Sequence, residues 1–275
     1  MTGALDGKRV AFVGGGVMGE AIIRSLLNAG SIEPQQIVVS EPVAERRAAL
    51  NQTLGIACTA DNREAVQGAN VVVFAVKPQV LPSVLQGLRG SVSAGTLIVT
   101  IVAGAPIARF VEALGTPAVV RVIPNTPGQI GQGASLWTDT PGTTEQQRAQ
   151  ARQLLDALGV QVRGHSEDEV DMATALSGSG PAYVFLFIEA LTDAGVQIGL
   201  TRDVAATLAL QTVLGSAEYV RQADLHPAIL RNRVTSPGGT TAAALHELEA
   251  GAFRATITRA VLAAYRQAQR LGGAS

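Results

Sequence analysis

The stretch Lys8-Arg-Val-Ala-Phe-Val-Gly-Gly-Gly-Val-Met-Gly-Glu20 decides the fold of this chain. Residues 8–13 are expected to form a short buried strand, and residues 20–29 a helix that stops at Gly30. Between them, residues 14–19 match G-x-G-x-x-G, whose glycines allow a tight turn, a close approach to a pyrophosphate and close packing of helix on strand. A plain tight turn is the alternative, but the position between a strand and a helix favours a dinucleotide site.

Further apolar segments follow this stretch, and helical segments alternate with them. The other predicted strands are residues 37–39, 70–76, 96–102 and 118–123. Such alternation is typical of parallel βαβ units, and strands that are apolar throughout are expected in a sheet covered on both faces. The sequence therefore predicts an α/β protein whose N-terminal part is a Rossmann-type parallel sheet domain.

The character of the chain changes after Gly164, because no strand signal follows it. The predicted helical segments are residues 167–176, 181–199, 202–222, 227–232, 241–248 and 253–271. We expect a boundary between a dinucleotide-binding domain, residues 1–164, and an all-helical C-terminal domain, residues 165–275. Residues 181–222 are too apolar to stay exposed on a lone small domain, so a dimer is expected.

Composition excludes several classes of protein. The chain has 275 residues, of which 47% are hydrophobic and 16% charged, enough to bury a substantial core. A net charge of -1 and an aromatic content of 4% argue against nucleic acid and an anionic membrane as partners. We expect no membrane span, because glycine or charge interrupts every run of about 18 apolar residues. The N-terminus lacks a signal pattern and the single cysteine, Cys58, rules out an internal disulfide, so a cytoplasmic protein is expected.

The residues that end the second predicted strand bear on the choice of cofactor. Glu41 lies about 20 residues past the glycine loop, where an acidic residue binds a ribose 2′-hydroxyl and favours NAD. Ser40 and the pair Arg46-Arg47 could instead hold the 2′-phosphate of NADP. Glu41 could also serve only to cap the helix expected from Pro42. These cues conflict, so the sequence leaves the cofactor open.

Polar residues also follow other strands and lie in the loops between them. Lys77 comes directly after the third strand, where open α/β sheets bind ligands, although a lysine that merely snorkels is the alternative. Asp61-Asn62 is expected to cap the start of a helix, and Asn62 could also reach the cofactor. Asn125 lies in a loop stiffened by two prolines, which is either a rigid turn or a neighbour of the nicotinamide. No two of the three histidines have metal-ligand spacing, so no metal is expected.

Two glycine- and hydroxyl-rich segments open helices in the second half. Residues 234–241 read Val-Thr-Ser-Pro-Gly-Gly-Thr-Thr and present hydroxyls and bare backbone N–H groups, which bind a carboxylate well. Residues 176–181 read Leu-Ser-Gly-Ser-Gly-Pro, in which Ser177 and Ser179 either cap the helix or contact a substrate. A serine hydrolase is excluded, because no strand leads into this turn.

Five motifs occur in one order along the chain. They are Val-Gly-Gly-Gly-Val-Met-Gly at 13–19, Ala-Val-Lys-Pro-Gln at 75–79, Pro-Asn-Thr-Pro at 124–127, Leu-Ser-Gly-Ser-Gly-Pro-Ala-Tyr at 176–183 and Thr-Ser-Pro-Gly-Gly-Thr-Thr at 235–241. Together they resemble the pyrroline-5-carboxylate reductase family, from about residue 8 to residue 271. The last two motifs are highly specific, whereas the first is shared by many dehydrogenases. Ile123 stands where the family commonly has methionine, a swap that conserves volume.

The resemblance implies an activity, a cofactor and an assembly. The activity is reduction of the cyclic imine of 1-pyrroline-5-carboxylate to L-proline, the last step of proline biosynthesis, by NADPH, with NADH as the alternative. The loop Ser236–Thr241 is expected to hold the substrate carboxylate, and the Thr241 hydroxyl to lie near the imine nitrogen. The helical domain is expected to form a homodimer, and dimers to assemble into a larger ring such as a decamer.

Hydride transfer to a C=N carbon depends on geometry more than on a strong acid. The protein must align the nicotinamide with the imine carbon, fix the carboxylate and offer one hydroxyl to the nitrogen. The predicted catalytic residues are Thr241 and Ser236. The predicted substrate-binding residues are Ser179, Gly238, Gly239, Thr240 and Thr241. The predicted cofactor-binding residues are Gly14, Gly16, Val17, Met18, Gly19, Ser40, Glu41, Arg46, Asn62, Ala75, Val76, Lys77, Pro78 and Asn125.

Two rival functions stay open at this point. A non-catalytic NAD(P)-binding sensor would keep the fold, but the complete motif at residues 235–241 argues against it. A β-hydroxyacid dehydrogenase uses a catalytic lysine in its helical domain, and no lysine follows Lys77 in this chain.

Overall fold

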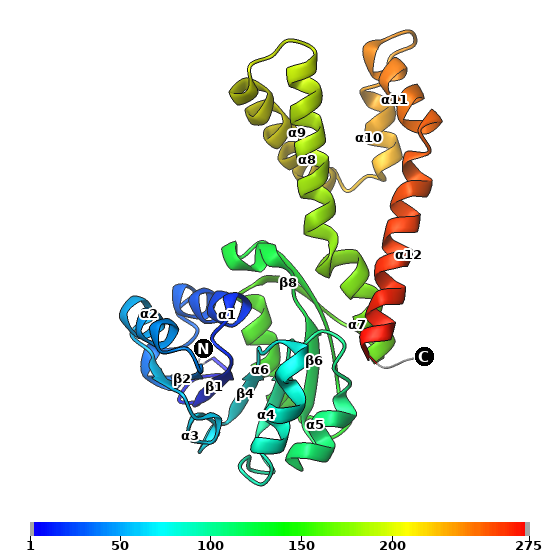
Figure 1. Cartoon of the computed structure of the whole chain (residues 1–275). Coiled ribbons are helices and arrows are strands. Elements are labelled where there is room, and N and C mark those ends of the chain that lie inside the picture. Colours follow the sequence, from blue (N-terminus) through cyan, green and yellow to red (C-terminus); the bar gives the residue numbers. More distant parts are fainter. Residues whose placement is uncertain (1–2, 273–275) are drawn as a thin grey trace. The chain divides into compact units, whose positions relative to one another are not determined.

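The computed structural model describes residues 3–272 and divides them into two compact units (Figure 1). The first unit contains the chain up to Ser179 together with the chain from Ala264 onward. The second unit is Gly180–Ala263. The first is built on a β-sheet and the second contains only helices within the described residues, which confirms the predicted order of an α/β part followed by a helical part.

The sheet of the first unit has eight strands within residues 3–272, in the order β3-β2-β1-β4-β5-β6-β7-β8. They are β1 Val10–Val13, β2 Ile37–Ser40, β3 Ala57–Thr59, β4 Val71–Phe74, β5 Leu97–Thr100, β6 Val119–Ile123, β7 Gly133–Asp139 and β8 Gly159–Arg163. The strands pair in parallel except for β6 and β7, which run antiparallel. All five predicted strands are present, and β3, β7 and β8 are additional.

Helices cover the sheet of this unit. They are α1 Val17–Asn28, α2 Ala44–Leu54, α3 Asn62–Val66, α4 Leu81–Gly87, α5 Ile107–Leu114, α6 Glu145–Asp156 and α7 Glu167–Ala173, with the end of α12, Phe253–Gly272. Successive residues of β1 face opposite sides, so that Phe12 joins one apolar cluster with Ile23 and Leu154, while Ala11 joins another with Phe110. The five predicted strands, β1, β2, β4, β5 and β6, are therefore buried on both faces, as expected from their apolar sequences. Each fully buried apolar side chain stabilises the fold by about 1.5–3 kcal/mol.

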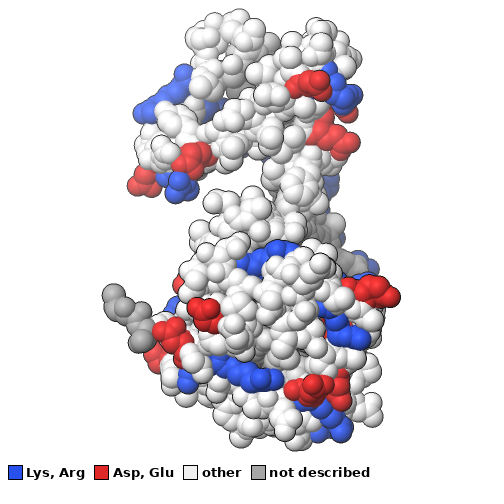
Figure 2. Space-filling view, turned by 90° about the vertical axis from the view of Figure 1, so that its left-hand side faces the viewer, with Lys and Arg blue, Asp and Glu red and all other residues white. Residues whose placement is uncertain are grey.

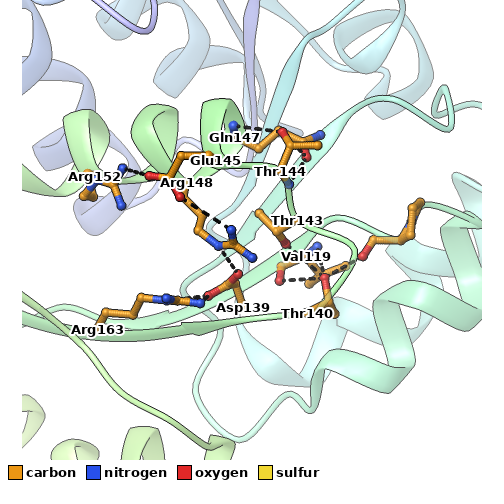
Figure 3. Close-up of polar contacts among 11 residues, drawn as sticks. Val119, Asp139, Thr140, Thr143, Thr144, Glu145, Gln147, Arg148, Arg152 and Arg163 are labelled. Carbon is orange, nitrogen blue, oxygen red and sulfur yellow. Dashed lines mark hydrogen bonds and ion pairs between the residues drawn. The ribbon is translucent and has the colours of Figure 1, made fainter.

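A polar cluster fixes the antiparallel edge of the sheet (Figure 3). Asp139, at the end of β7, has a side chain only 1% exposed and accepts hydrogen bonds from Arg148 Nε on α6 and Arg163 Nε on β8, both at 2.8 Å. The guanidinium of Arg163 also lies over the ring of Trp137, 5.6 Å from its centroid. One buried carboxylate thus joins two strands and a helix.

The boundary of the compact units lies after the predicted boundary at residue 164. Arg121 on β6 forms ion pairs with Glu167 and Asp171, and these pairs attach α7 to the sheet. Burial raises the pKa of Asp171 and outweighs the opposing effect of Arg121. Near the other end of the chain, a Cβ built on Gly104 would lie 2.8 Å from the carbonyl carbon of Leu271, so the end of α12 packs closely on this loop. These contacts keep α7 and the last turns of α12 with the sheet.

The second unit consists of α8 Gly180–Gln197, α9 Arg202–Ala223, α10 Pro227–Arg233, α11 Thr240–Ala250 and the first part of α12. Each helix matches a predicted segment to within a few residues. Few of its described side chains are buried, and Phe185, Leu186, Leu208 and Leu214 are between 54% and 66% exposed. Figure 2 shows few acidic or basic side chains over most of the face of this unit that it presents.

One helical run among the described residues meets the length and composition of a membrane span, which does not by itself contradict the expectation that no segment crosses a membrane. The helical run Glu167–Gln197 has 31 residues, and its most apolar 18-residue part has a mean hydropathy of 1.2, so the run is long and apolar enough by length and composition alone. One such helix is weak support for a span, since an apolar helix that packs against another protein surface has the same composition.

Candidate functional site

The glycine loop has the geometry that its sequence predicts. Gly14 has φ of +103°, and a Cβ built on it would lie 2.8 Å from the carbonyl oxygen of Ala75. A Cβ on Gly19 would lie 2.6 Å from the carbonyl oxygen of Gly14, so only glycine lets α1 pack this closely on the loop. Gly16 differs, because nothing lies within 4 Å of its Cβ position. Open space beside Gly16, at the start of α1, is where a pyrophosphate fits.

A cavity of about 340 Å³ opens at this helix start. It is lined by Gly16, Val17, Glu20, Ala21, Arg24, Arg46 and Gln129. Glu20 pairs with Arg24 at 2.6 Å and with Arg46, so one carboxylate bridges both guanidinium groups and leaves a net positive charge beside the cavity. Burial alone would raise the pKa of Glu20, but the hydrogen bonds from the two arginines outweigh it and hold that pKa below its usual value. The donors and the open glycine fit a dinucleotide phosphate.

The end of β2 lies beside this loop. The Gly14 N–H donates to the carbonyl oxygen of Ser40 at 2.9 Å, and the Gly15 N–H donates to Glu41 Oε2 at 3.1 Å. The hydroxyl of Ser40 is buried and donates to the carbonyl oxygen of Phe12 at 3.4 Å, which weighs against its predicted contact with a cofactor. Helix α2 begins at Ala44 rather than at Pro42, two residues later than predicted.

The remaining predicted cofactor residues lie in loops at the carboxyl ends of parallel strands. The segment from Ala75 to Pro78 follows β4, with Ala75 against the glycine loop and Lys77 exposed. Asn62 is the first residue of α3, and Asp61 caps that helix as predicted, accepting the Arg63 N–H at 2.8 Å.

Asn125 follows β6 and helps to shape its loop. Its Oδ1 accepts the Ala134 N–H at 2.9 Å, which joins this loop to the first residues of β7. Met18, on the first turn of α1, packs its side chain against the core rather than lining the cavity. In the described part of the chain, no group of three or more metal-ligating side chains gathers.

Four cavity residues were not predicted from the sequence, and three of them, Glu20, Arg24 and Gln129, are polar. Glu20 and Arg24 lie one turn apart on α1, and their spacing after a glycine loop is the signal that could have identified them. Gln129 lies in the short 3₁₀ turn Thr126–Ile130, which packs beside α1. No local pattern marks Gln129, because its place depends on that tertiary contact.

The predicted carboxylate loop lies in the second unit and opens α11. Gly238 has φ of +70°, a conformation that favours glycine, and the Gly239 N–H donates to the carbonyl oxygen of Ser236 at 3.0 Å. A Cβ built on Gly239 would clash with the Ser236 hydroxyl, so a larger residue at this position would require that side chain to move. Within residues 3–272, no side chain caps this helix start. The first backbone N–H groups of α11, beginning at Thr240 and Thr241, are therefore available to an anion.

The serine-rich segment forms an unusual turn at the end of the first unit. Residues Thr174–Gly178 make a π-helical turn between α7 and α8. The Ser177 hydroxyl donates to the carbonyl oxygen of Ala173 at 3.1 Å, and the Ser179 N–H donates to that of Thr174 at 2.9 Å. A Cβ on Gly178 would lie 3.3 Å from Ile123, so this glycine allows close packing on β6. These contacts are local hydrogen bonds within the turn, with no side-chain cap at its start from the described residues, and the predicted substrate contact of Ser179 stays a prediction.

Comparison with known proteins adds to this picture. Residues 167–271 match the family model described as pyrroline-5-carboxylate reductase dimerisation, and residues 9–104 match NADP oxidoreductase coenzyme F420-dependent. The chain is 42% identical to the pyrroline-5-carboxylate reductase of Synechocystis over 96% of its length and 98% of that protein. It is 43% identical to the reductase of Pseudomonas aeruginosa, with 96% of each chain covered.

Solved structures agree. The chain resembles a pyrroline-5-carboxylate reductase from Coxiella burnetii with a TM-score of 0.89 and 35% identity, covering 96% of this chain and 98% of that one. It resembles the pyrroline carboxylate reductase of Plasmodium falciparum with NADP bound with a TM-score of 0.87 and 32% identity, over the same shares of the two chains. A ketol-acid reductoisomerase at 15% identity and a TM-score of 0.65 shares the fold alone.

Proposed function

The chain belongs to the pyrroline-5-carboxylate reductase family, and from that premise we propose which of its residues carry the reaction. The activity is reduction of the imine of 1-pyrroline-5-carboxylate to L-proline by a reduced nicotinamide dinucleotide, the closing step of proline biosynthesis. The observation that carries the residue assignment is the uncapped start of α11 behind Gly238 and Gly239.

The glycine loop binds the dinucleotide in this proposal. Gly16 leaves room for the pyrophosphate, while Arg24 and Arg46 offset its charge at the start of α1. Lys77 and Asn125, each at the carboxyl end of a strand, supply polar contacts to the rest of the cofactor. When bound, the reduced nicotinamide supplies the hydride that reduces the C=N bond. The sequence prediction is NADPH, which the arginines after β2 support, with NADH as the alternative, which Glu41 supports.

The start of α11 holds the substrate carboxylate. The N–H groups of Thr240 and Thr241 and the Ser236 hydroxyl are donors, and the positive end of the helix favours an anion there. A carboxylate fixed on rigid backbone donors leaves the ring of the substrate with little freedom to turn. Such fixing is the main contribution a protein makes to a reaction that depends on alignment.

Thr241 contacts the imine nitrogen of the substrate in this proposal. Its hydroxyl, on the first turn of α11, is half-buried and can donate a hydrogen bond to the nitrogen or pass a proton to it. A protonated imine is the better electrophile, so a donor at this atom accelerates reduction. Ser236 acts as an auxiliary donor from the same loop.

A steady-state assay tests the function. Purified protein is mixed with 1-pyrroline-5-carboxylate and either NADH or NADPH, and oxidation of the dinucleotide and formation of proline are followed. We expect one proline for each dinucleotide oxidised. Dinucleotide binding without turnover would indicate a non-catalytic sensor, and turnover only with a β-hydroxyacid would indicate the dehydrogenase alternative.

The chain oligomerises, and we propose that the assembly is a homodimer that can extend to a larger ring such as a decamer. The exposed apolar helices of the second unit support this. We also propose that the enzyme works in the cytoplasm, because its single cysteine fits a reducing compartment.

A further inference from the structure

Glu41 follows β2 directly and its carboxylate lies against the glycine loop. Oε2 accepts the Gly15 N–H and Oε1 accepts the Val43 N–H, both at 3.1 Å. The register of the sheet fixes this arrangement, because Val13 at the end of β1 pairs with Ser40 at the end of β2. Both oxygens are therefore held by backbone groups from two different strand ends, and the carboxylate has one defined place.

That place is where the adenosine ribose of a bound dinucleotide lies in proteins of this fold. A Cβ built on Gly15 would lie 2.7 Å from Leu50 and 3.3 Å from the Cβ of Glu41, so the loop backbone packs directly on this side chain. An ionised carboxylate accepts about four hydrogen bonds, and two of its positions are used here. The remaining positions suit the hydroxyl groups of a ribose.

The positive groups that could receive a 2′-phosphate are already engaged. Arg46 donates from Nε to the carbonyl oxygen of Gly15 at 2.9 Å and pairs with Glu20. Arg47 donates from one nitrogen to the carbonyl oxygens of Glu41 and Pro42 at 2.7 and 2.8 Å. A phosphate at this point would have to draw Arg46 away from Glu20, and it would still lie beside the Glu41 carboxylate.

We propose that Glu41 determines cofactor specificity and that this chain binds NADH in preference to NADPH. The inference rests on the proposed use of a nicotinamide dinucleotide. It favours NADH, the alternative cofactor, over the predicted NADPH. A ribose 2′-hydroxyl can donate to the carboxylate, whereas a 2′-phosphate brings like charge against it. The preference thus follows from one side chain that two backbone N–H groups fix in place.

Direct binding tests the proposal without the substrate. The dissociation constants of NADH and NADPH are measured by fluorescence titration for the natural protein, for Glu41→Gln and for Glu45→Gln. Glu45 is the matched control, because it is an exposed carboxylate on the first turn of α2. The natural protein is expected to bind NADH more tightly by about 10-fold or more, the factor of a hydrogen bond to a charged group. Glu41→Gln should remove that ratio, and Glu45→Gln should keep it.

Two results would overturn the proposal: tighter binding of NADPH by the natural protein, or an unchanged ratio in Glu41→Gln. Circular dichroism checks that each variant is folded. If Glu41→Gln is not folded, the natural protein is titrated with 5′-AMP and 2′,5′-ADP instead. Tighter binding of 2′,5′-ADP would refute the proposal. These titrations measure binding and not turnover. A protein that binds the two dinucleotides with the expected ratio but does not reduce 1-pyrroline-5-carboxylate in the steady-state assay would refute the proposed function alone.

Discussion

At the scale of the residue, Thr241 is the group whose chemistry can be isolated. Its hydroxyl lies on the first turn of α11, and its backbone N–H lies at the proposed carboxylate site. Thr241→Ala removes the hydroxyl together with a methyl group, and loss of the hydroxyl is expected to lower kcat by about 10²-fold, the usual contribution of one positioned proton donor. Dinucleotide affinity should stay the same, and Thr241→Ser should retain most of the activity. An alanine variant that turns over at the natural rate would remove Thr241 from the mechanism.

A single methyl group can probe the pyrophosphate site in the same way. Because nothing lies within 4 Å of the Cβ position of Gly16, Gly16→Ala should leave the melting temperature of the free protein unchanged. The methyl would occupy the space of the phosphate and weaken dinucleotide binding about tenfold or more. Gly95→Ala, whose Cβ position is equally open but lies outside the loop, is the control for calorimetric titration. If the two variants bind the dinucleotide with equal affinity, the pyrophosphate does not lie beside Gly16.

At the scale of the element, the Asp139 cluster predicts a stability effect (Figure 3). Asp139→Asn removes a buried charge that binds Arg148 and Arg163, and unfolding in urea should become easier by about 2–3 kcal/mol. Glu145→Gln is the control: it also faces Arg148, but its side chain is 72% exposed, so little change is expected. Equal shifts in the two urea midpoints would show that burial of the carboxylate contributes nothing.

Sequence patterns identified some elements better than others, for physical reasons. Strands β1, β4 and β5 are buried on both faces and are apolar throughout, so they stand out from their surroundings. Strands β7 and β8 mix polar and apolar residues, and the valines of β8 are exposed at an edge, so neither resembles a buried strand. The helix starts marked by Asp61 and Gly239 were predicted because capping is local. The Arg46–Glu20 pair was not, because it joins α1 to α2 across the loop.

At the scale of the whole molecule, the sequence predicted one sheet domain and one helical domain but not where the compact units divide. A boundary at residue 164 follows the change in composition, since acidic and apolar helices begin there. The units divide at Ser179 instead, because Arg121 attaches α7 to the sheet and Leu271 packs on Gly104. Contacts between distant parts of the chain set this division, and a pattern read along the sequence does not contain them.

The exposed helices of the second unit predict the assembly state. Phe185, Leu186 and Leu214 are each at least 59% exposed on α8 and α9, more apolar surface than a lone small unit keeps in water. A second copy of the chain can cover it, so sedimentation at micromolar concentration should give at least twice the chain mass of 28.3 kDa. Leu186→Glu should shift the protein toward the monomer, because burying an unpaired charge is costly. Val43→Glu, which makes an equal change at an exposed residue of the first unit, should not. If the natural protein is a monomer, the proposed homodimer is contradicted, and a different partner must cover those side chains.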